Sequence, residues 1–83
     1  MKTYVFTYFG EGYNCYDFRV NANRFSQAYA SFCVHLNTVS KNIKICGFSH
    51  SYKVISNSKS RYCFLSYNRL LALEIIKDKC YEN

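Results

Sequence analysis

Aromatic side chains at every second position mark the beginning of this sequence. Within residues 2–9, Thr or Val alternates with aromatic residues from Thr3 to Tyr8. Residues 13–21 continue the period of two in a more polar form, and this spacing is typical of β-strands. The segment 10–12, Gly-Glu-Gly, tolerates the positive φ angles of a short connection. The sequence therefore predicts a hairpin with one apolar and one mostly polar face. The predicted apolar face consists of Tyr4, Phe6, Tyr8, Tyr16, Phe18 and Val20.

The apolar spacing changes to that of a helix after residue 23. Large apolar side chains recur at i, i+3, i+4, i+7 and i+11, which places them on one stripe of an α-helix. Asn21 or Asn23 can cap this helix by accepting a hydrogen bond from a free backbone N–H. We expect the helix to lie across the apolar face of the hairpin. The stripe consists of Phe25, Ala28, Tyr29, Phe32 and Leu36.

The second half of the chain repeats the succession of strands and helix. Residues 43–55 predict a third strand with a bulge near Gly47, and residues 56–60 form a turn-forming cluster. Residues 62–67 are consistent with a fourth strand, and a helix that begins near Ser60 fits almost as well.

Asn68 is positioned to cap a final helix that runs through Leu70, Leu73, Ile76 and Cys80. The predicted order is β-β-α-β-β-α in one compact domain, residues 1–83. This is an α+β fold, a small antiparallel sheet with helices on one face and the opposite face open.

Composition places the chain among small globular proteins. It has 83 residues, nine Tyr, seven Phe and no Trp. A chain of this length buries about 60% of the surface its unfolded form exposes, so we expect some tyrosines to reach the surface. The cysteines are odd in number and widely spaced, which is a poor disulfide framework, and no signal peptide or membrane-spanning run occurs. The sequence favours reduced thiols and a cytoplasmic location. The cysteines are Cys15, Cys33, Cys46, Cys63 and Cys80.

The net charge of +6 is unevenly distributed along the chain. No carboxylate side chain occurs between Phe18 and Leu73, whereas this stretch carries eight Lys and Arg residues. Such a charge distribution favours phosphate backbones or acidic protein surfaces as partners. A composition rich in Lys, Asn, Tyr and Phe is also typical of A+T-rich genomes. The acids are Glu11, Asp17, Glu74, Asp78 and Glu82.

Motifs for catalysis or metal binding are weak. Cys33 with His35, and Cys46 with His50, supply zinc-type ligands, but their spacing differs from that of the common zinc fingers. No signature indicates an activated nucleophile, and no glycine-rich loop opens a helix. We expect no enzymatic activity, no cofactor and no metal.

Basic residues interleaved with tyrosines are the stronger signal. Aromatic rings stack on unpaired bases while Lys and Arg contact phosphates, and Tyr and Arg are also frequent in protein-binding hot spots. We expect the cations in the middle of the chain to share one solvent-facing patch with tyrosines. The candidate binding residues are Arg19, Lys44, Tyr52, Lys53, Lys59, Arg61 and Tyr62.

The chain resembles small phage-encoded host-takeover and counter-defence proteins, including the anti-CRISPR inhibitors. The resemblance lies in its size, its thiols, its Asn-, Lys-, Tyr- and Phe-rich composition and the hairpin-then-helix plan of residues 2–36. No diagnostic motif matches, so no functional residue is carried over.

The resemblance implies a non-enzymatic inhibitor in the host-cell cytoplasm. Its partner would be a host protein or ribonucleoprotein complex of the defence or nucleic-acid-processing machinery. The alternative is a stand-alone RNA- or DNA-binding protein that uses the same residues. A third hypothesis is a subunit that forms a homodimer, instead of a monomer, through an uncovered sheet edge or face.

Overall fold

The structure is a four-stranded sheet with two helices packed against it. It is a computed structural model that describes the backbone of residues 1–81 and the side chains of residues 1–78. The predicted order β-β-α-β-β-α is confirmed. The elements are β1 (Lys2–Gly10), the short 3-10 turn η1 (Glu11–Tyr13), β2 (Cys15–Ala22), α1 (Phe25–Val39), β3 (Ile45–Ser56), β4 (Lys59–Phe64) and α2 (Tyr67–Tyr81).

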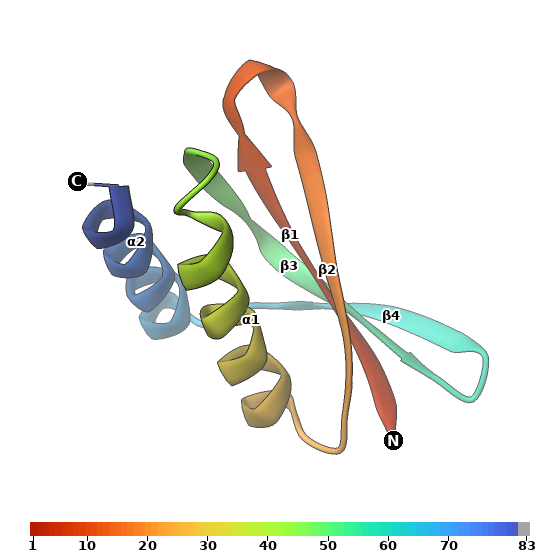
Figure 1. Cartoon of the computed structure of the whole chain (residues 1–83). Helices are drawn as coiled ribbons and strands as arrows, with labels where there is room; N and C mark the ends of the chain where they lie inside the picture. The colour runs from red at the N-terminus through yellow and green to blue at the C-terminus, as the bar shows by residue number, and fades with distance from the viewer. Residues whose placement is uncertain (82–83) are drawn as a thin grey trace.

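All strand pairs in the sheet are antiparallel, in the order β2-β1-β3-β4. Both helices lie on the same side of this sheet (Figure 1). Because side chains alternate along a strand, the predicted apolar side of the first hairpin faces the helices. The other side of the sheet, which we call the open face, is covered by neither helix.

Stacked aromatic rings form the centre of the core between α1 and the sheet. Phe6 on β1 and Phe32 on α1 are fully buried, and their ring centroids are 4.6 Å apart in a stacked arrangement. Phe18 on β2 stacks on Phe32 at 5.8 Å. Ala28 and Leu36 on α1 are also fully buried. The apolar stripe that the spacing predicts is therefore the surface that α1 buries.

The N-terminal turns of the two helices are joined by Tyr29 and Arg69. Tyr29 donates a hydrogen bond from its hydroxyl to the carbonyl oxygen of Arg69, at 2.8 Å. Burial raises the pKa of Tyr29 to about 12, so the hydroxyl keeps its proton and remains a donor. The Arg69 guanidinium lies over the rings of Phe25 and Tyr29, at 5.0 and 4.6 Å from their centroids. Packing of the helices therefore uses this cation.

The second hairpin differs from the prediction at its boundaries. The third strand begins at Ile45, and its register against β1 shifts at two places, one of them beside Gly47. The fourth element is a strand, but it covers Lys59–Phe64 and not residues 62–67. The turn is shorter than expected because Asn57 and Ser58 both adopt positive φ angles, 53° and 64°, which closes a hairpin in two residues.

Both helices are capped by residues other than the predicted ones. At the start of α1, the Gln27 side-chain oxygen accepts hydrogen bonds from the backbone N–H groups of Asn23 and Arg24. At the start of α2, Ser66 accepts from the backbone N–H of Arg69 at 3.3 Å. Ser66 rather than Asn68 is the cap because α2 already includes Tyr67.

Substitution of Phe32 by Ala should destabilise the fold by about 3–5 kcal/mol, because it removes a buried ring that stacks on two others. Urea unfolding followed by circular dichroism measures this free energy. The matched control is Val34→Ala, on the same helix but 65% exposed, which should change stability by less than about 0.5 kcal/mol. Equal losses in the two variants would contradict this description of the core.

Candidate functional site

The turn of the β3–β4 hairpin extends beyond both helices and carries several cations. In Figure 1 this turn lies at the end of the molecule opposite α2, and no helix lies over it. We call residues 51–64 the β3–β4 arm. The arm carries Lys53, Lys59 and Arg61 and no carboxylate side chain. No side chain of the arm itself therefore neutralises these three positive charges.

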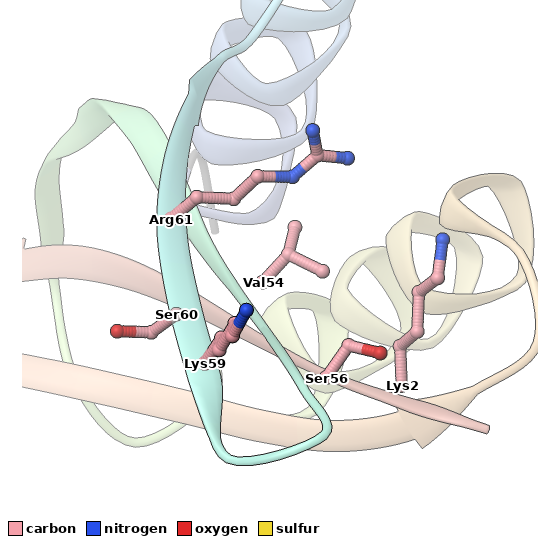
Figure 2. A pocket seen from close by; sticks show the side chains of 6 residues that line it. All are labelled: Lys2, Val54, Ser56, Lys59, Ser60 and Arg61. Atoms are coloured by element: carbon pink, nitrogen blue, oxygen red, sulfur yellow. The ribbon is translucent and has the colours of Figure 1, made fainter.

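A basic depression lies on the helix-facing side of the arm. Lys59 and Arg61 are alternate residues of β4 and therefore share a face, and Lys2 approaches from the start of β1. Figure 2 shows these three side chains around Val54, whose side chain forms the floor. The depression has a volume of about 400 Å³, and Ser56 and Ser60 complete its wall. We call it the cationic pocket.

A second group of basic and aromatic residues lies on the open face. One row of paired residues crosses the whole sheet: Arg19 on β2, Val5 on β1, Lys53 on β3 and Tyr62 on β4. Val5 is the buried member of this row, although neither helix covers it. The Lys53 ammonium lies 5.9 Å from the centroid of the Tyr62 ring, a cation–π distance.

The four carboxylate side chains that the structure describes lie away from the cationic pocket. Glu11 is in η1, at the far end of the first hairpin. Glu74 and Asp78 are on α2, where the Lys77 ammonium contacts them at 2.8 and 3.8 Å. Asp17 is on the open face and accepts a hydrogen bond from Thr7 at 2.7 Å. Among the residues that the structure describes, no carboxylate forms an ion pair with Lys2, Lys59 or Arg61, so these carboxylates do not neutralise the pocket.

The seven candidate residues do not share one face. Lys59 and Arg61 lie in the cationic pocket, whereas Arg19, Lys53 and Tyr62 lie on the open face. The arm thus carries two distinct surfaces, one on each side of the sheet.

The structure separates the two remaining candidates from the arm's surfaces. Lys44 precedes β3 at the end of the sheet where Gly10 pairs with Ile45, far from the turn of the arm. Tyr52 is half-buried in the aromatic core, with its ring 4.7 Å from that of Phe25. Burial raises the pKa of Tyr52, and its ring is not available for stacking from solvent.

Lys2 and Phe64 belong to these surfaces and were not among the predicted candidates. Lys2 and Tyr4 are alternate residues of β1 and point to the same side of the sheet. Extending the alternation of residues 3–8 back to Lys2 could have assigned Lys2 to the helix-facing side. Phe64 has the same parity as Tyr62 and is 84% exposed on the open face. Hydrophobicity alone assigns such a residue to the core, which is why sequence reasoning overlooked it.

His35 has a structural environment rather than a metal-binding one. Its Nε2 lies 2.9 Å from the Tyr8 hydroxyl, and its ring stacks on Phe18 with centroids 4.4 Å apart. Among the described residues, no three Cys, His, Asp or Glu side chains come close enough to hold a metal ion. Four cysteines, Cys15, Cys33, Cys46 and Cys63, are free thiols.

Comparison with protein-family models, curated proteins and solved structures gives no match for this chain. In the part of the chain that the structure describes, no helix is both long enough and apolar enough to cross a bilayer.

Lowering the pH should destabilise the protein through His35. Burial lowers the pKa of His35 from its ordinary value of 6.5. The unfolded chain therefore binds this proton at a higher pH than the folded chain, and the free energy of unfolding falls as the pH drops through about 6.5. Urea unfolding between about pH 7.5 and pH 5 measures this slope, which should be smaller in His35→Gln.

The matched control for that experiment is His50→Gln, at an exposed position on β3. This variant should keep the slope of the wild-type protein. A His35→Gln variant with an unchanged slope would contradict the assignment.

Proposed function

We propose that the protein binds nucleic acid through the β3–β4 arm and does not act as an enzyme. The observation that carries this proposal is the cationic pocket, three basic side chains around one open depression with no carboxylate among its lining residues. A phosphate chain is the common biological ligand that offers closely spaced negative charges to such a surface.

The shape of the arm also suits a nucleic-acid partner. Exposed sheet surfaces hold single strands. The arm is the edge of the four-stranded sheet, because residues 52–55 of β3 also pair with β1, and its turn extends beyond the helices (Figure 1). Both of its sides carry a cation, Lys53 on the open face and Arg61 in the pocket.

Reversal of two pocket charges should weaken this binding strongly. The double variant Lys59→Glu, Arg61→Glu removes two phosphate contacts, so the logarithmic salt slope of the affinity should fall by about 1.4–1.8. Fluorescence anisotropy with labelled single- and double-stranded oligonucleotides, at about 50 and 200 mM salt, measures the affinity and slope.

The matched control is Lys41→Glu, Lys44→Glu, which changes the net charge equally but at the other end of the sheet. It should retain most of the affinity and the slope. If both double variants bind equally weakly, total charge and not the pocket determines binding. A wild-type protein that binds no oligonucleotide at low salt would refute the proposal.

A second candidate function is inhibition of a host complex by direct protein contact. It is favoured by Tyr67, Leu71 and Ile75, which are exposed on α2 at spacings of four residues and therefore lie on one helix face. An exposed apolar stripe of this kind is a feature of protein-binding surfaces. This candidate corresponds to a phage-type inhibitor that acts in the host cytoplasm.

For that candidate, a pull-down from host lysate with and without nuclease is the test. A partner bound directly should persist after nuclease treatment and be lost from Ile75→Glu. The matched control is Val34→Glu, because Val34 on α1 is also 65% exposed and lies away from the stripe. Loss of every captured protein after nuclease treatment would exclude direct protein inhibition.

A further inference from the structure

We infer that the open face of the arm binds unpaired bases, so that the partner is a single-stranded nucleic acid whose bases stack on Tyr62 and Phe64. We call these two residues the stacking pair. This inference rests on the proposed nucleic-acid binding and adds the class of ligand. It concerns the opposite side of the sheet from the cationic pocket.

The stacking pair is exposed to a degree that core packing does not explain. Tyr62 is 72% exposed and Phe64 is 84% exposed, although both lie within a regular strand. Their partners on β3 are Lys53 and Ser51, neither of which is an apolar residue. The rings therefore gain little from burial within the chain and are free to contact a ligand.

The spacing of the pair fits an unstacked strand. Alternate residues of an antiparallel strand are about 6.8 Å apart, whereas adjacent bases of a duplex strand are stacked about 3.4 Å apart. Two rings on one strand therefore meet adjacent bases only where these have separated from each other. Single-stranded regions allow such separation, and a duplex does not.

Cations on the same face are placed to contact the phosphates between such bases. Lys53 lies between Tyr62 and Val5 in the row that crosses the sheet, and Arg19 ends this row on β2. Asp17 lines the same depression as Arg19 and Lys53, and its carboxylate accepts a hydrogen bond from the Thr7 hydroxyl in the adjacent row. Two cations against one carboxylate leave this part of the face with a net positive charge.

Small polar side chains lie beside the cations on this face. Thr7, Ser49 and Ser51 line a small depression of about 130 Å³ next to Lys53. Small polar side chains of this kind leave planar bases room to approach the aromatic rings.

The test compares two labelled probes with the same phosphate backbone. One is an oligomer of twelve thymidines, and the other is a twelve-residue abasic oligomer without bases. Wild-type protein should bind the thymidine probe at least about fivefold more tightly, since stacking on each aromatic residue stabilises the complex substantially. Tyr62→Ala and Phe64→Ala should each reduce this preference, which is measured as the ratio of the affinities of one variant for the two probes.

Two controls make the comparison specific. Tyr62→Phe keeps the ring and should keep the preference. Tyr13→Ala removes a fully exposed aromatic residue from the first hairpin and should also leave the preference unchanged. Circular dichroism verifies that each variant is folded, which the exposure of these side chains favours.

The outcomes separate this inference from the proposed function. If wild-type protein binds both probes equally, the arm binds phosphates but the stacking inference is wrong. A preference for the thymidine probe that survives both alanine substitutions also overturns it. If neither probe binds but a double-stranded oligonucleotide does, the stacking inference is wrong and nucleic-acid binding stands. If no oligonucleotide binds, nucleic-acid binding itself is wrong and a protein partner becomes the explanation for the exposed rings.

Discussion

Phe6 and Phe32 stack at 4.6 Å between the middle of the sheet and α1, and both rings are fully buried. Tyr52 and Phe25 extend this contact, with the Tyr52 ring 5.6 Å from Phe6 and 4.7 Å from Phe25. Aromatic rings bury more surface per residue than other side chains, which allows a chain of 83 residues to form a core at all. The same contact fixes which side of the sheet the helices occupy. The side that the helices occupy in turn determines which strand residues are buried and which lie on the open face.

Two helices of fifteen residues each cover only part of a sheet whose longest strand has twelve residues. One side of the sheet is left uncovered, and the end of the β3–β4 arm is uncovered on both sides. An exposed edge strand without charged side chains risks pairing with other chains. Here the edge strand β4 carries Lys59 and Arg61 on one side and large exposed rings on the other. The two charges therefore also protect from aggregation an edge that the exposed rings alone would make prone to it.

Much of the fold follows from periodicity, and the arrangement of the candidate site does not. The alternation in residues 2–9 and the stripe on α1 are strong signals, because each is repeated over several turns or pairs. The sequence predicts the fourth strand at residues 62–67, which places Lys59 in the turn and Arg61 between the turn and the strand. A strand that begins at Lys59 instead assigns them to one face and Tyr62 to the other. Faces of a sheet depend on the parity of a single position, so an error of three residues at a boundary hides their separation.

Turn geometry determines which chemistry lies on each side of the arm. Asn57 and Ser58 close the hairpin in two residues, and this length fixes the pairing of Lys53 with Tyr62. One additional residue in the turn would shift β4 by one position and exchange its two faces. The cations of the pocket would then lie on the open face, and the stacking pair would face the helices. The separation of the cationic pocket from the stacking pair therefore depends on the turn as much as on the composition. Ser58 has a positive φ of 64°, which glycine would adopt at lower cost, so this register is maintained at the expense of local backbone strain.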